Sequence, residues 1–74
     1  MQMSSMQCAE ITVDKDILGG TPVFQGTRVP IQSLFEHLEA GDSLAQFLEG
    51  FPSVSKEQSI SVLKHAEKSV IDAA

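Results

Sequence analysis

Cysteine is almost absent from this sequence, since Cys8 is the only one in 74 residues. No disulfide can form within the chain, and a lone cysteine is typical of proteins from the reducing cytoplasm. His37 and His65 lie far from Cys8 and from each other, without the short spacing of a zinc site. We therefore expect no metal and no cofactor.

Long apolar runs are missing as well. No stretch approaches the roughly 20 apolar residues that a membrane-spanning helix needs. Residues 1–10 lack both the basic start and the continuous apolar run of a signal peptide. We expect a cytoplasmic location, no contact with membranes, and a flexible leader over residues 1–10.

Positive charge is scarce, because 5 Lys and Arg face 10 Asp and Glu, which gives a formal net charge of −5. This balance opposes indiscriminate attraction to nucleic acid. It favours a basic protein as the binding partner. It does not indicate the fold, which has to be inferred from the apolar pattern.

The chain is short enough to hold only one domain, which we expect over residues 11–74. A domain of this size buries roughly 60% of the surface that its unfolded chain exposes. Such a core rarely supplies more than about 3–5 kcal/mol of stability. Because disulfides and metals are excluded as supports, we expect a homodimer.

Residues 11–29 have the pattern of short strands joined by turns. Extended runs are predicted at 11–13, 21–24 and 27–29, with turns at 19–20 and 25–26. Pro30 biases Val29 towards an extended backbone. Strands this short are not stable alone, so they must pack on helices or pair with a second copy.

Three amphipathic helices are predicted after this segment, at 30–40, 43–50 and 55–72. Apolar residues recur with helical spacing in each. Ser43 with Gln46, and Ser55 with Gln58, form capping boxes at the starts of the second and third helices. The apolar half of the third helix contains Ile60, Val62, Leu63, Ala66, Val70 and Ile71.

The apolar faces of these helices must cover one another. The expected fold class is mainly α: a three-helix, homeodomain-like or winged helix-turn-helix bundle with a short N-terminal β segment over about residues 11–29.

No catalytic arrangement is recognisable. His37, beside Glu36 and Glu39, is interpreted as a solvated histidine on a helix surface, and His65 lies in no known motif. The glycines at 19–20 lack the surroundings of a phosphate-binding loop. We predict that the chain is not an enzyme and has no small-molecule substrate.

The polar face of the third helix is the candidate DNA-binding surface. Lysines contact phosphates, and Gln or Ser can reach base edges. Two lysines neutralise few phosphates, so DNA binding calls for a dimer or for a partner protein that brings more positive charge. An ordinary solvated helix face is the alternative. The candidate DNA-binding residues are Gln58, Ser61, Lys64, His65 and Lys68.

The extended segment is the candidate contact with a second copy or another partner. Exposed strand edges favour pairing across a two-fold axis. Arg28, the only arginine, could instead form an ordinary surface salt bridge. The candidate contact residues are Ile11, Val13, Val23, Phe24 and Arg28.

Residues 20–30, GTPVFQGTRVP, contain the spacing Gly-x-Pro-x-x-x-Gly-Thr-Arg-x-Pro. Together with ITVDKDILGG, LFEHLEAGDSLAQFLEGFP and VSKEQSISVLKHA, this segment resembles the bacterial family called domain of unknown function 433 over residues 11–66. The resemblance implies a homeodomain-like or winged-helix DNA-binding fold. It also implies a VapB-type antitoxin that silences a PIN-like ribonuclease toxin and represses their shared operon by binding operator DNA. A stand-alone helix-turn-helix regulator and an interaction module without DNA binding are the alternatives.

Overall fold

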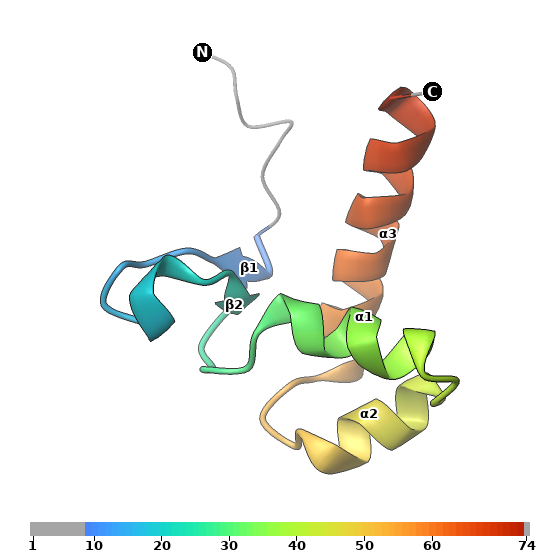
Figure 1. Cartoon of the computed structure of the whole chain (residues 1–74), viewed down its shortest axis with the longest axis horizontal. Coiled ribbons are helices and arrows are strands. Elements are labelled where there is room, and N and C mark those ends of the chain that lie inside the picture. The colour runs from blue at the N-terminus through green and yellow to red at the C-terminus, as the bar shows by residue number, and fades with distance from the viewer. Residues whose placement is uncertain (1–8, 74) are drawn as a thin grey trace.

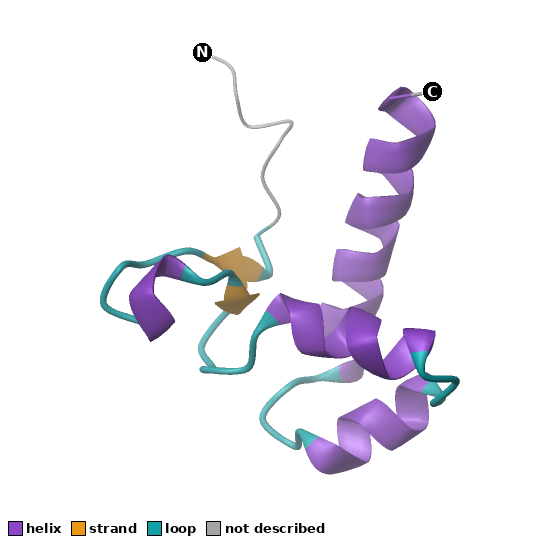
Figure 2. Cartoon of the chain, in the orientation of Figure 1, coloured by secondary structure: helices purple, strands orange, loops and turns teal. Residues whose placement is uncertain are grey.

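The computed structural model of the chain describes residues 9–73. Its elements are β1 (Ile11–Thr12), the 3-10 helix η2 (Leu18–Gly20), β2 (Val23–Phe24), α1 (Ile31–Glu39), α2 (Leu44–Gly50) and α3 (Lys56–Ala73). Figures 1 and 2 show α2 beneath α1, with β1 and the end of α3 on the opposite side of α1. The predicted mainly α fold, with three helices and a short N-terminal β segment, is confirmed. Residues 1–8 of the predicted leader lie outside the described residues.

The β segment is smaller than predicted. β1 and β2 pair antiparallel, with Ile11 opposite Phe24, but residues 27–29 form no strand. They belong instead to a tight turn, in which Gly26 has a φ of +78° and the Phe24 N–H donates to the Val29 carbonyl at 3.0 Å. Pro30 makes a single bridge to Val23, because a proline has no N–H with which to continue a ladder.

The helix starts follow the predicted capping boxes. The Ser43 Oγ accepts from the Gln46 N–H at 3.1 Å, and the Gln46 side chain accepts from the Ser43 N–H at 2.7 Å. The corresponding distances for Ser55 and Gln58 are both 3.0 Å. Because the serines are caps rather than helical residues, α2 and α3 begin one residue later than predicted.

The ends of α1 also differ slightly from the prediction. Pro30 is the N-cap, with an extended backbone, and not the first helical residue. Gly41 has a φ of +93°, the left-handed conformation expected of a residue that follows a helix. This glycine turns the chain back towards α2.

The core joins all the main elements. Its buried apolar side chains are Val23, Phe24, Ile31, Leu34, Phe47, Val54 and Val62. The fully buried Ser59 was not predicted to lie there, since it is polar. Its hydroxyl donates to the Ser55 carbonyl one turn earlier, at 3.3 Å, and its small volume lets α3 approach the other helices.

The C-terminal half of α3 does not have the predicted environment. Val70 and Ile71 are 70% and 63% exposed, although the sequence places them on the apolar half of the helix. The reason is length: α3 has 18 residues, whereas α1 has 9 and α2 has 7, so the neighbours end first. Figure 1 shows this half of α3 extending beyond the bundle. Within residues 9–73, no helix is both long and apolar enough to cross a membrane.

Candidate nucleic-acid interface and apolar groove

Four of the five predicted DNA-binding residues lie together on α3. Ser61, Lys64, His65 and Lys68 follow the spacing i, i+3, i+4 and i+7, which places them on one side of a helix. Both lysines are exposed, and Ser61 and His65 are half-buried. Lys68 makes an ion pair with Asp72 at 3.2 Å within the helix. The structure therefore brings these four side chains together along the middle of α3.

Gln58, the fifth, is committed to the fold. Its Oε1 accepts from the Ser55 N–H at 3.0 Å, and its Nε2 donates to the Gln25 carbonyl at 2.9 Å. The side chain thus joins the start of α3 to the turn after β2. Contact with a base edge would require both bonds to break. The capping box was the sequence signal for this structural role.

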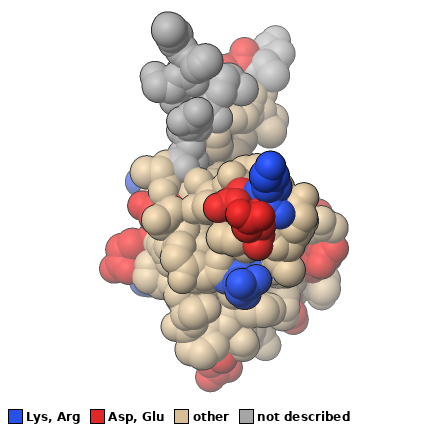
Figure 3. All heavy atoms as spheres, turned by 90° about the vertical axis from the view of Figure 1, so that its left-hand side faces the viewer, with Lys and Arg blue, Asp and Glu red and all other residues tan. Residues whose placement is uncertain are grey.

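Charge on α3 is balanced. The helix has three lysines, at 56, 64 and 68, and three acidic residues, at 57, 67 and 72. Figure 3 shows the side of the molecule on which the β segment lies, where basic and acidic groups lie next to one another among uncharged surface. A face of this kind gives weak electrostatic attraction to a phosphate backbone.

The connection between α2 and α3 is short and ordered. The Val54 N–H donates to the Phe51 carbonyl at 3.0 Å, and the Val54 side chain is 4% exposed. Phe51 packs on Phe47 with their ring centroids 5.0 Å apart. These contacts fix the start of α3 against α2, in the order helix, tight turn and longer helix.

The residues predicted to contact another copy are divided by the fold. The side chains of Val23 and Phe24 are 0% exposed, so they cannot serve as contacts with another chain. They are buried because β2 packs directly on the helices. Val13 is 65% exposed, Ile11 is half-buried, and Arg28 is exposed without an ion pair among the residues that the structure describes.

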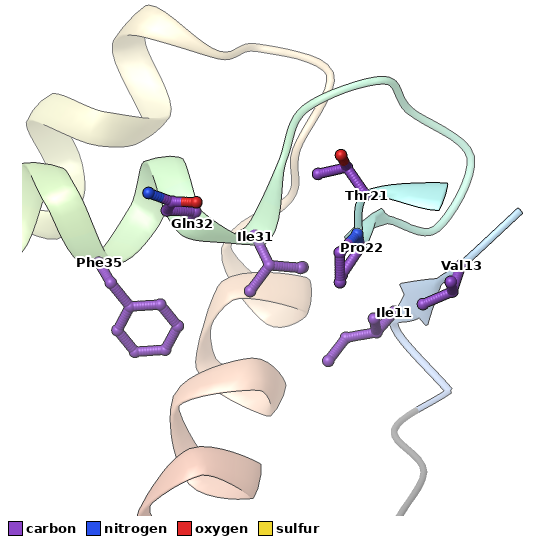
Figure 4. A pocket seen from close by; sticks show the side chains of 7 residues that line it. All are labelled: Ile11, Val13, Thr21, Pro22, Ile31, Gln32 and Phe35. Atoms are coloured by element: carbon purple, nitrogen blue, oxygen red, sulfur yellow. The ribbon is translucent and has the colours of Figure 1, made fainter. Parts of the chain in front are cut away.

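An apolar groove that the sequence analysis did not predict lies between the β segment and α1. Its volume is about 490 Å³, and its lining is Ile11, Val13, Thr21, Pro22, Ile31, Gln32 and Phe35. Figure 4 shows the side chains of Ile11, Ile31 and Phe35 directed to a common space. Ile31 and Phe35 belong to the apolar face that helical spacing predicts for the first helix; Ile31 is buried and Phe35 is half-buried. One indication in the sequence was missed. The apolar face of α1 is broader than the part that packs on the core, so the remainder of that face lines the groove.

His37 is not the solvated histidine that the sequence suggested. Its Nδ1 lies 2.9 Å from the Asp42 Oδ2, and its side chain is 36% exposed. Its ring meets Phe47 and Phe51 edge-on, with centroids 5.5 and 5.7 Å apart. The Gly41 turn brings Asp42 back to the end of α1, a contact that helical spacing does not indicate. Across the described part of the chain, no group of three His, Cys, Asp or Glu side chains could hold a metal.

These features define a class: a small mainly α protein with an apolar groove between its β segment and α1 and a third helix that extends from the bundle. A family model described as "Protein of unknown function (DUF433)" matches residues 11–66, so the chain belongs to this family, as its resemblance had indicated. It is also 46% identical over 48 residues to a protein from Sinorhizobium fredii (strain NBRC 101917 / NGR234) that is named uncharacterized protein y4eO. The matched segment is 65% of this chain and only 22% of that relative's length. No solved structure matches the chain significantly.

Proposed function

We propose that this chain is a cytoplasmic, antitoxin-like DNA-binding protein that neutralises a PIN-like ribonuclease toxin and represses the operon encoding both. The observation that carries the proposal is the polar cluster of Ser61, Lys64, His65 and Lys68 on one side of α3. A helix is about 10–12 Å across, which fits the major groove of about 12 Å. The proposal assigns no catalytic step to the chain.

Charge supports the need for two copies on DNA. Each phosphate contact contributes a salt slope of about −0.9, so two lysines from one copy hold DNA weakly. A homodimer doubles the contacts and sets a half-site spacing. Arg28 and the outer edge of β1 are the parts of the predicted contact segment that remain available for pairing, since Val23 and Phe24 are buried.

Charge also supports the toxin partner. A protein with a net charge of −5 attracts a basic nuclease over a long range and disfavours acidic partners. The chain belongs to a family of unknown function over residues 11–66. A toxin partner is what the resemblance described in the sequence analysis implies.

The DNA-binding part is tested with the DNA upstream of the chain's own gene. We expect the double variant Lys64→Ala, Lys68→Ala to bind at least about 10-fold more weakly, with a salt slope smaller by about 1 for each lysine. Alanine favours helix, so circular dichroism should show α3 unchanged. Lys15→Ala, which removes one positive charge from the loop before η2, is the control for the loss of a lysine outside α3, and each single variant, Lys64→Ala or Lys68→Ala, is its charge-matched counterpart. Unchanged affinity and slope in the double variant would exclude α3 as the DNA-binding element.

The toxin part is tested by co-expression with the product of the adjacent gene. We expect a complex that co-purifies and growth that recovers. Absence of both results would remove the antitoxin role and leave a stand-alone helix-turn-helix regulator.

An interaction module without DNA binding is the second candidate, and the apolar groove together with the balanced charge of α3 favours it. Protein binding at the groove, combined with no measurable affinity for the upstream DNA at low salt, would identify this alternative.

A further inference from the structure

The small sheet has one open edge, and it belongs to β1. Among the described residues, β1 has a strand partner on one side only, since the sheet has the order β1–β2. On its side away from β1, β2 is already bonded, because the Phe24 N–H donates to the Val29 carbonyl at 3.0 Å. The Ile31 N–H donates to the Pro22 carbonyl at 3.0 Å on this same side. Only the outer edge of β1 is therefore left for a further strand.

The hydrogen-bond pattern shows which backbone groups lie on this edge. The Gln25 N–H donates to the Glu10 carbonyl at 2.8 Å, so Glu10 directs its carbonyl at the strand beside it. In an antiparallel pair, the backbone groups of successive residues point to alternate sides of the strand. Thr12 therefore faces β2, whereas the N–H and C=O groups of Ile11 and Val13 point to the open edge.

The same two residues place apolar side chains beside the edge. Ile11 and Val13 both line the groove (Figure 4), as expected of residues two apart on one face of a strand. Ile11 is half-buried and Val13 is 65% exposed. Open backbone groups with apolar side chains next to them are the features by which a sheet edge binds an added strand.

β1 is also the element with the least support. β1 and β2 have two residues each, and such a short pair needs further strands or packing on helices to be stable. β2 has that packing, because its two side chains are fully buried. Both residues of β1 are only half-buried. A further strand would therefore stabilise β1 more than any other element.

We propose that the chain forms a homodimer in which β1 of one copy pairs antiparallel with β1 of the other, across a two-fold axis at Thr12. Ile11 then lies opposite Val13 of the second copy, and Val13 opposite Ile11. Each of these two pairs exchanges two backbone hydrogen bonds, and the exposed Val13 side chain packs on an isoleucine. The inference deepens the proposed function, on which it rests only for the expectation that two copies associate.

A second copy fits this edge because the edge is complementary to itself. In the register with Thr12 on the axis, every outward N–H and C=O group of Ile11 and Val13 has a partner. Charge opposes the pairing, since each copy has a net charge of −5 and Glu10 comes to lie opposite Asp14 of the second copy. Like charges directly opposite each other destabilise a strand pair, so the dimer should strengthen with added salt.

Disulfide cross-linking tests the register. The two Thr12 residues form a non-hydrogen-bonded pair with Cα atoms about 4.5 Å apart, which suits a disulfide. The two Val13 residues lie on opposite sides of the axis, with Cα atoms roughly 8 Å apart, which is too far. In a Cys8→Ser background and under mild oxidation, we expect Thr12→Cys to give at least about 10-fold more covalent dimer than the more exposed Val13→Cys. Equal yields, or no dimer from Thr12→Cys, would overturn the proposal.

Sedimentation at micromolar concentration tests the edge itself. Val13→Pro removes an N–H that points to the second copy, at a position where a strand tolerates proline. We expect unchanged helix content by circular dichroism and a dimer at least about 10-fold weaker. Val13→Ala keeps the N–H and should weaken the dimer less. A monomeric wild type, or a dimer that survives Val13→Pro but is lost in Val70→Ser, would contradict pairing through β1.

Charge provides a further test of the register. Glu10→Gln removes the repulsion by Asp14 of the second copy, so the dimer should tighten at least about 2-fold at low salt. Glu49→Gln is the matched control, because it removes the same charge from α2. If Glu10→Gln is no tighter than this control, the two residues are not opposite each other and the register is wrong.

These outcomes are separable from the proposed function. A Thr12→Cys dimer that has no affinity for the upstream DNA would keep the β1 pairing and remove the DNA-binding role. Specific binding to that DNA by a chain that gives no Thr12→Cys dimer would remove the β1 pairing and leave the DNA-binding role in place.

Discussion

The Thr27 hydroxyl holds the turn between β2 and α1. It donates to the Phe24 carbonyl at 2.8 Å and accepts from the Val29 N–H at 3.0 Å. With Gly26 in the left-handed region, these bonds explain why glycine and threonine stand together before Arg28. The segment that carries the family resemblance therefore has a structural role before any binding role.

Replacing Thr27 tests that role. Thr27→Val keeps the shape but leaves the Val29 N–H without its acceptor, so we expect a loss of about 1 kcal/mol in the free energy of unfolding. Thr27→Ser retains the hydroxyl and should lose clearly less. Urea denaturation measures both, and equal stability of the wild type and the valine variant would refute the argument.

His37 and Asp42 provide a second comparison at the residue scale. The contact between the His37 Nδ1 and the Asp42 carboxylate is partly exposed, so Asp42→Asn should cost less than about 1 kcal/mol. His37→Ala also removes the edge contacts with Phe47 and Phe51, worth about 0.5–1.5 kcal/mol, and should cost more. The reverse order in urea denaturation would show that the contact with Asp42, not the aromatic contact, holds the turn.

At the scale of elements, helix limits were predicted to within about one residue because capping is local. A serine and the glutamine three residues later satisfy each other's backbone groups whatever surrounds them. Coverage of a helix face is not local. The repeat that predicts an apolar face on α3 cannot show that α1 and α2 stop before Val70.

Gln58 makes one hydrogen bond of each kind. Its bond to the Ser55 N–H is local and follows from the capping box, whereas its bond to the Gln25 carbonyl joins residues far apart in the chain. Gln58→Glu keeps the acceptor of the capping box and loses the donor to the Gln25 carbonyl, whereas Gln58→Ala loses both. We expect an unfolding free energy lower by about 1 kcal/mol for the alanine variant, with the glutamate variant between it and wild type. If Gln58→Glu abolishes DNA binding at unchanged stability, Gln58 contacts bases after all.

At the scale of the whole molecule, the small number of Lys and Arg side chains and the net charge of −5 limit the affinity for DNA. Between 50 and 200 mM salt, affinity should fall about 10-fold if one copy makes two phosphate contacts, and more than about 100-fold if a dimer makes four. A filter-binding titration over this range therefore counts the copies on DNA. A slope near zero would exclude phosphate contact by Lys64 and Lys68.

Sequence alone determined the three helices, their limits, the glycine turns and the family, because each depends on residues close together in the chain. It also identified four neighbouring side chains on α3 as candidate DNA-binding residues. Tertiary structure decided which apolar residues are covered: Val23 and Phe24 are buried, while Val13 and Val70 are exposed. It alone revealed the groove and the His37–Asp42 pair. These features depend on how far neighbouring elements extend and where turns direct the chain, which periodicity does not encode.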